Sequence, residues 1–255
     1  MTGSVCEGMG AAWGRIGAWP LACCLTFGTV LALSLFWALA SISQVLALFP
    51  ALVVGLVWTG EVAYLLQQAD GSAEASVPPI GLANGVTMVR GGLYAVVAGF
   101  VFVPPGTPLD WVPAGAYGVG VLLDKLDGSL ARTVGTRSAL GERLDMAFDA
   151  FGLAVAPLVA VLWGLLPVWY LSLSAARYVF RAGVLWRQAR GLPVRDLPES
   201  DLRQYLAAFQ MVFVTVALVP QAPTPLVKAV APFAIAPSLG LFVRDYAAVV
   251  GWLDR

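Results

Sequence analysis

A long uncharged stretch near the N-terminus is the feature that most limits how this chain can fold. No Asp, Glu, Lys or Arg occurs between Arg15 and Glu61. A helix that crosses the hydrocarbon core of a bilayer needs about 20 residues, so this stretch predicts two membrane helices. We expect a hinge between them near residues 43–50. The chain is 59% hydrophobic and only 12% charged, which excludes an ordinary water-soluble domain.

Further apolar runs predict that the rest of the chain is helical as well. With the first pair they give an all-α integral membrane protein of about eight spans. A polar connector at 67–76 and the Pro78-Pro79 pair indicate a boundary, with a two-helix extension at 1–77 and a second domain at 78–255. Glycines at 115, 118 and 120 permit close helix contact. The six expected helices of the second domain cover residues 84–103, 111–131, 143–165, 167–188, 204–220 and 226–243.

The basic residues predict how the helices are oriented in the cytoplasmic membrane. Lys and Arg accumulate on cytoplasmic loops of membrane proteins. With the N-terminus in the cytoplasm, every basic residue except Lys228 falls at or toward the cytoplasmic side. The chain has 15 basic and 15 acidic residues, which gives no reason to expect nucleic acid as a partner. It contains no histidine, so carboxylates must carry any acid–base or metal chemistry.

Two pairs of aspartates lie close together in the sequence on the predicted cytoplasmic side. Asp124 and Asp127 are three residues apart, and Asp145 and Asp149 are four apart, so each pair shares one face of a helix. Four uncompensated aspartates at full membrane depth would cost roughly 10 kcal/mol, so we expect cations or protons nearby. Oxygen ligands favour magnesium, manganese or calcium. The alternative is that these acids are interfacial charges paired with neighbouring arginines.

The same aspartates belong to a longer pattern that resembles the signature of the CDP-alcohol phosphatidyltransferase family. The signature reads D-x-x-D-G-x-x-A-R, then eight residues, then G-x-x-x-D-x-x-x-D, and residues 124–149 fill all eight fixed positions. The resemblance covers roughly 78–245 and implies a six-helix core, to which the two N-terminal helices are an addition. Upstream, Asn84, Thr87 and Arg90 resemble the family's usual first-helix entry.

The resemblance implies a role for each signature residue. Asp124, Asp127 and Asp145 would be ligands of a divalent metal, Mg²⁺ or Mn²⁺, and Asp149 would share a second ion and act as the general base. Small residues would let the nucleotide approach the backbone, and an arginine would contact the donor diphosphate. These substrate-binding residues are Gly128, Ala131, Gly141 and Arg132, with Thr87 and Arg90 as weaker candidates.

The resemblance also implies the partners. The expected donor is CDP-diacylglycerol entering from the membrane lipids, and the acceptor is an alcohol; a CDP-linked head group donating to a lipid alcohol is the alternative. Arg177 and Arg181, one helical turn apart, would bind an anionic acceptor or, equally, lipid phosphates. Family members often form homodimers. A cation transporter or channel using the same acidic cluster, and a catalytically silent scaffold, are the alternatives from other classes.

Overall fold

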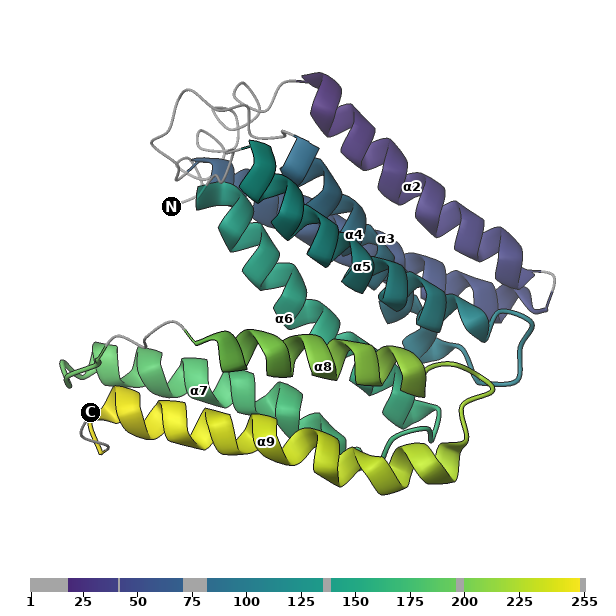
Figure 1. The fold of residues 1–255 in the computed structure, drawn as a ribbon. Coiled ribbons are helices and arrows are strands. Elements are labelled where there is room, and N and C mark those ends of the chain that lie inside the picture. The colour runs from purple at the N-terminus through teal and green to yellow at the C-terminus, as the bar shows by residue number, and fades with distance from the viewer. Residues whose placement is uncertain (1–17, 41, 71–81, 135–138, 196–199, 253–255) are drawn as a thin grey trace. The chain divides into compact units, whose positions relative to one another are not determined.

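The computed structural model describes residues 18–40, 42–70, 82–134, 139–195 and 200–252 (Figure 1). Within these ranges the chain is helical, with turns and short irregular segments between helices and no strand. The prediction of an all-α protein is therefore confirmed. The chain divides into two compact units, Met1–Val159 and Ala160–Arg255. Each unit is described in its own right below.

The described part of the first unit contains four complete helices and most of a fifth. Helix α2 contacts α3, which also contacts α4, and α4 contacts α5 (Figure 1). The last residues of α6 belong to the second unit. The elements are α2 (Ala18–Ala40), α3 (Gln44–Asp70), α4 (Leu82–Gly99), η1 (Phe100–Phe102), α5 (Trp111–Val134) and α6 (Ala139–Leu162).

Helix α2 ends at Ala40 and α3 begins at Gln44, so the second helix starts within the predicted hinge at 43–50. Helix α3 then continues through Pro50, which lies in the predicted hinge. Proline inside a helix removes one backbone hydrogen bond, and its ring clashes with the carbonyl group four residues earlier. Pro50 is buried, and its carbonyl oxygen lies 3.1 Å from the position that a Cβ atom on Gly99 would occupy. Close packing of α3 against α4 therefore holds this turn in the helix.

An apolar cluster joins the N-terminal helices to the rest of the first unit. The Trp58 indole donates a hydrogen bond to the Cys24 carbonyl oxygen at 2.9 Å, which ties α3 to α2. Between helices in a bilayer, such contacts stabilise packing through van der Waals attraction. The cluster takes residues from α3, α4 and α6, and they are Trp58, Val62, Leu65, Leu66, Met88, Leu140, Leu144 and Phe148.

Two glycines bring α4, α5 and α6 close together around one aromatic ring. A Cβ atom on Gly120 of α5 would lie 2.5 Å from Tyr94 Cε1, and one on Gly152 of α6 would lie 2.6 Å from Tyr94 Cε2. Neither distance leaves room for a side chain, so glycine is required at both positions. The predicted close contact is thus found at Gly120, whereas Gly115 faces open space. Tyr94 lies one helical turn after Arg90, which places the candidate site described below.

Where the structure describes it, the second unit holds the last residues of α6 and then one 3₁₀ turn and three helices. These are η2 (Val168–Leu171), α7 (Ser172–Ala189), α8 (Asp201–Ala217) and α9 (Thr224–Val250). A buried polar network joins η2, α8 and α9. The Tyr170 hydroxyl donates to Gln210 Oε1, while Gln210 Nε2 donates to the Ala234 carbonyl oxygen at 2.6 Å and to Ser238 Oγ at 3.0 Å. Because these buried polar groups satisfy one another, the network is suited to an apolar interior.

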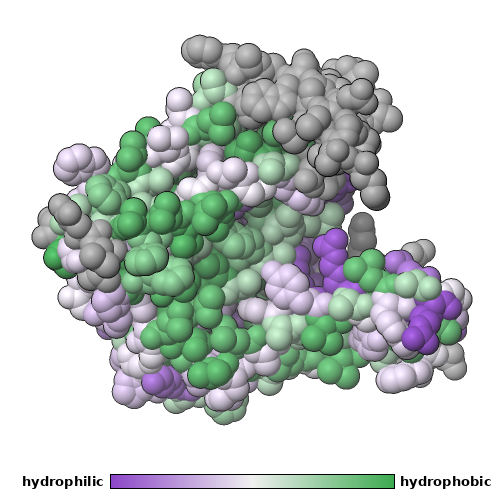
Figure 2. Space-filling view, turned by 180° about the vertical axis from the view of Figure 1, so that it is seen from behind, coloured by the Kyte–Doolittle hydropathy of each residue, from purple (hydrophilic) through white to green (hydrophobic). Residues whose placement is uncertain are grey.

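Among the residues that the structure describes, five helices are long and apolar enough to cross a membrane. The large apolar residues Trp37, Leu56, Phe233 and Val243 are mostly exposed, and Figure 2 shows broad apolar surface of the kind that faces lipid. Helices α5, α7 and α8 fall outside the five, so their membrane crossing stays a prediction. The five candidate spans are Ala22–Ala40, Ala47–Leu66, Asn84–Phe102, Leu140–Leu162 and Thr224–Val250.

Candidate metal centre

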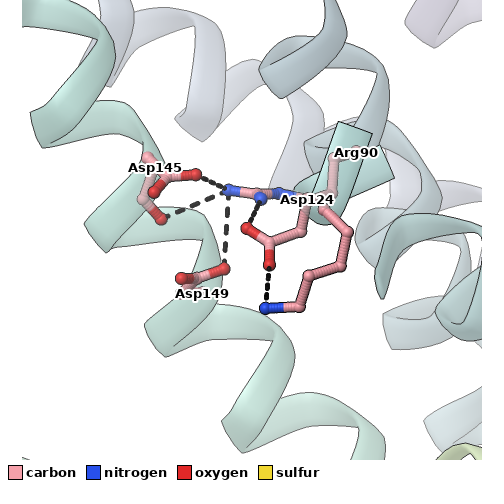
Figure 3. A network of polar contacts seen from close by, with 5 residues as sticks. Arg90, Asp124, Asp145 and Asp149 are labelled. Atoms are coloured by element: carbon pink, nitrogen blue, oxygen red, sulfur yellow. Dashed lines mark hydrogen bonds and ion pairs between the residues drawn. The ribbon is translucent and has the colours of Figure 1, made fainter. Parts of the chain in front are cut away.

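Three aspartates from two helices converge on one arginine in the first unit (Figure 3). Arg90 lies on α4, Asp124 on α5, and Asp145 and Asp149 on α6. Asp145 and Asp149 extend from consecutive turns of α6, as their spacing of four residues predicts. Two other residues of the same helix, Leu144 and Phe148, are buried in the apolar cluster, so packing fixes the rotation of α6.

The Arg90 guanidinium contacts all three carboxylates. Its Nη1 donates to Asp124 Oδ1 at 2.6 Å, and its Nη2 donates to Asp145 Oδ1. Nη2 also lies 3.5 Å from Asp149 Oδ1. The Arg90 side chain is 1% exposed, whereas those of Asp124, Asp149 and Asp145 are 17%, 25% and 42% exposed. The arginine therefore closes the buried side of the cluster, and the carboxylates can be reached from the other side.

The donor set fits a hard divalent cation. One oxygen of each of Asp124, Asp145 and Asp149 can be chosen so that all three lie within 4.8 Å of one another. Arg90 offsets one of the three negative charges, and the largely exposed Lys125 ammonium lies 3.6 Å from Asp124 Oδ2. Carboxylate oxygens are the preferred ligands of magnesium and manganese, and the absence of histidine from the sequence removes the usual ligand of zinc or copper.

Three further residues of the predicted pattern lie on the same helices as the cluster, one or two turns away from it. Thr87 is buried on α4, one turn before Arg90, and Asn84 is buried one turn earlier. Gly141 is half-buried in the first turn of α6, one turn before Asp145. The remaining signature residues lie in α5, but their side chains fall outside the described part of the structure, so their roles stay predictions. They are Asp127, Gly128, Ala131 and Arg132.

The two arginines predicted to bind an anionic acceptor belong to the second unit. Arg177 and Arg181 lie on α7, one turn apart, and Arg177 is half-buried while Arg181 is exposed. This geometry is suited to an anion and equally to lipid phosphates.

One buried carboxyl group was not among the site residues predicted from the sequence. Glu61 on α3 is 8% exposed, and a Cβ atom on Gly91 would lie 2.7 Å from its Oε2. The available signal was its position, because Glu61 is the first acidic residue after the long uncharged stretch and lies within the span Ala47–Leu66. An ionisable residue within a membrane span is by default a candidate functional residue.

Comparisons with known proteins agree with the geometry. The sequence model of the CDP-alcohol phosphatidyltransferase family matches residues 80–244, which is more than half of the chain. Proteins named "Putative cardiolipin synthase" from Mycobacterium bovis and Mycobacterium tuberculosis are 28% identical to the chain over 135 residues. The aligned region is 49% of this chain and 61% of each relative, so the chain spans less than two thirds of their length.

Proposed function

Because this chain belongs to the CDP-alcohol phosphatidyltransferase family, we propose that it transfers a phosphatidyl-type group from a CDP-activated donor to an alcohol in phospholipid biosynthesis. The observation that carries the proposal is the convergence of Asp124, Asp145 and Asp149, within 4.8 Å of one another, in an apolar helical protein. An enzyme that joins a lipid-linked donor to an alcohol needs such a site within reach of the membrane.

The aspartates would hold the metal ions. Asp124 and Asp145, with Asp127, are proposed as ligands of one Mg²⁺ or Mn²⁺ ion, and Asp149 would share a second. Bound ions of this kind neutralise a diphosphate and orient it for in-line attack. Arg132 would contact the same diphosphate. The small residues Gly128, Ala131 and Gly141 would leave space for the nucleotide, with Thr87 and Arg90 completing the site from α4.

Asp149 would act as the general base. Its carboxylate accepts the proton of the acceptor hydroxyl while that oxygen attacks the donor phosphorus that carries the lipid. A new phosphorus–oxygen bond forms, the bond between this phosphorus and the CMP oxygen breaks, and CMP leaves with the bonding electrons. The Asp149 side chain is 25% exposed, so it can reach both solvent and substrate.

CDP-diacylglycerol is the donor that we propose, and it would enter from the bilayer. The acceptor would be a polar alcohol from the cytoplasm, and Arg177 and Arg181 would bind it if it carries a phosphate. The name of the mycobacterial relatives adds cardiolipin to the products to be tested.

We further propose that residues 1–77 are a two-helix extension of a domain at 78–255, and that the active site faces the cytoplasm of a multi-pass, homodimeric protein in the cytoplasmic membrane. The distribution of basic residues supports this orientation. Thr136→Cys, in a background without native cysteines, should resist an impermeant thiol reagent in intact cells. Labelling from outside would contradict the orientation.

The proposed activity can be tested with purified full-length protein in detergent. CDP-diacylglycerol, Mg²⁺ or Mn²⁺ and a panel of alcohols should give CMP and a new phospholipid, both abolished by a chelator. Glu142→Gln is a suitable control because Glu142 is exposed on α6 outside the signature. Metal-dependent ion flux without CMP release would favour a transporter, and absence of both would favour a scaffold.

A further inference from the structure

A buried aromatic ring lies one helical turn from the aspartate cluster. Tyr94 follows Arg90 by four residues on α4, and its side chain is fully buried. Side chains of a helix lean toward its N-terminus, so Tyr94 leans toward the turn that carries Arg90. Among the described residues, the charges that act on Tyr94 are those of Arg90 and the three aspartates. The ring is therefore a neighbour of the cluster.

The same ring separates the two helices that carry the aspartates. A Cβ atom on Gly120 of α5 would lie 2.5 Å from Tyr94 Cε1, and one on Gly152 of α6 would lie 2.6 Å from Tyr94 Cε2. These two carbon atoms are on opposite edges of the ring, so α5 and α6 face each other across its width. Glycine adds no side chain that would keep two helices apart. The width of the Tyr94 ring therefore sets how closely α5 and α6 approach at this level.

Both glycine contacts lie one turn from the aspartates. Gly120 is four residues before Asp124 on α5, and Gly152 is three residues after Asp149 on α6. Residues three or four apart share one face of a helix, and at 1.5 Å per residue they are about 4.5–6 Å apart along its axis. A change in the distance between α5 and α6 at the ring therefore also changes the separation of Asp124 from Asp149.

The volume of the Tyr94 side chain makes these contacts. Its hydroxyl group is buried and has no hydrogen-bond partner among the residues that the structure describes. The ring also packs against the buried ring of Tyr117, with 5.4 Å between the two centroids. Close-packed interiors contain few voids and transmit a change in side-chain volume to their neighbours. The ring is thus held in place on three sides, as a spacer between helices must be.

We propose that Tyr94 is a positioning residue that makes the metal centre selective for magnesium over calcium. This inference rests on the proposed function. Mg²⁺ requires near-ideal octahedral geometry with oxygens at about 2.0–2.1 Å, whereas Ca²⁺ accepts less regular sets of oxygens at about 2.3–2.6 Å. By fixing the distance between α5 and α6, the ring holds Asp124 and Asp149 at the separation that the smaller ion needs. A smaller side chain at position 94 leaves the carboxylates less constrained, which Ca²⁺ tolerates better than Mg²⁺.

The test is ion binding to the purified full-length protein in detergent, without donor or acceptor. Electron paramagnetic resonance of free Mn²⁺ measures the affinity for Mn²⁺, and displacement of bound Mn²⁺ measures the affinities for Mg²⁺ and Ca²⁺. Wild type should bind Mg²⁺ more tightly than Ca²⁺. Tyr94→Leu should bind Mg²⁺ about tenfold more weakly and change its Ca²⁺ affinity less than about twofold, because only Mg²⁺ requires strict geometry.

Two matched variants separate the ring from its hydroxyl group and from packing in general. Tyr94→Phe keeps the ring and should keep both affinities within about twofold of wild type. Phe100→Leu removes a buried ring of the same unit, six residues beyond Tyr94. It should lower the midpoint of thermal unfolding but leave the ratio of Mg²⁺ to Ca²⁺ affinity unchanged.

Gly152→Ala keeps the test decisive if Tyr94→Leu fails to fold. The added methyl group would lie 2.6 Å from Tyr94 Cε2, so α6 must move away from the ring. This variant should also lose Mg²⁺ affinity while its Ca²⁺ affinity changes less than about twofold. Equal weakening of Mg²⁺ and Ca²⁺ binding in either variant would overturn the inference, because the residue would then act only through stability.

Three other results would also overturn the inference. They are unchanged affinities in Tyr94→Leu, a wild type that binds Ca²⁺ as tightly as Mg²⁺, and a loss in Tyr94→Phe equal to that in Tyr94→Leu. Failure of this inference differs from failure of the proposed function. If wild type binds Mg²⁺ and releases CMP but Tyr94→Leu keeps its ion selectivity, only the role of Tyr94 is wrong. If wild type releases no CMP with any donor, the proposed function is wrong.

Discussion

Each of the two compact units contains a cluster of arginine and aspartate around one buried member, and the two clusters have opposite proportions. In the first unit, one buried arginine, Arg90, meets three aspartates. In the second unit, one buried aspartate, Asp245 on α9, meets two arginines. Arg203 Nη1 of α8 lies 3.3 Å from Asp245 Oδ2, and Arg244 Nη2 lies 2.9 Å from Oδ1.

The ratio of aspartate to arginine sets the net charge of each cluster, and the net charge decides which cluster can bind a cation. Three carboxylates and one guanidinium leave two negative charges, so the cluster around Arg90 has the charge to hold a divalent ion even with Lys125 beside it. One carboxylate and two guanidiniums leave one positive charge, and both oxygens of Asp245 already accept hydrogen bonds. The second cluster is therefore suited to joining α8 to α9. The same residue types thus form a candidate metal centre in one unit and a packing contact in the other.

The largest effect that would separate the two clusters is expected from Asp149→Asn. Asparagine keeps the shape of the side chain but cannot accept the proton, so turnover should fall about 100-fold or more if general-base catalysis is lost. Metal and donor binding should largely survive. The measurements are CMP release and donor binding in matched detergent, with folding checked by elution profile. Near-normal turnover in Asp149→Asn, alongside inactive variants of the other aspartates, would assign the base elsewhere.

Asp127→Asn provides the matched contrast. The signature places Asp127 on the metal, so this change should lower donor affinity and turnover together, and extra magnesium or manganese should recover part of the activity. Metal-dependence curves for the two variants distinguish a base from a ligand. Identical curves would show that the two aspartates do the same work.

A smaller effect is expected from Arg177→Gln combined with Arg181→Gln on α7. If these arginines bind an acceptor phosphate, the apparent KM for the acceptor should rise about tenfold, with little change for the donor. Arg190→Gln is the control, because Arg190 is exposed just after the same helix and lies over the Trp186 ring. Equal changes in both KM values would instead leave Arg177 and Arg181 as contacts to lipid phosphates.

Much of the fold could be predicted because its signals are local in sequence. The apolar run expected at 111–131 is helix Trp111–Val134, and the expected run at 143–165 is Ala139–Leu162. Spacing also predicted that Asp145 and Asp149 would share one face of their helix. Where charge interrupts an apolar run, as at Asp124 and Lys125 of α5, local hydropathy no longer decides whether the helix spans a membrane.

The contacts between helices could not be predicted in the same way. Arg90 lies 34 residues before Asp124, and nothing in the local pattern pairs them. The apolar residues of α3 are not confined to one face, so its sequence does not say which face packs against the protein and which against lipid. The place of Glu61 therefore depended on packing by Trp58 and Leu65, and on the missing side chain of Gly91.

The smallest effect on activity is expected from Asp245→Asn, and it tests the comparison most directly. This change leaves Arg203 and Arg244 with a neutral acceptor in a buried position, so it should destabilise the protein by about 1–3 kcal/mol. Thermal unfolding in detergent should shift to lower temperature, while the turnover of the folded protein should change less than twofold. Asp201→Asn, an exposed aspartate in the first turn of α8, should leave the unfolding midpoint nearly unchanged. If Asp245→Asn instead lowered turnover as far as Asp149→Asn without loss of stability, the second cluster would belong to the reaction, and the proportions of arginine and aspartate would not distinguish a site from a packing contact.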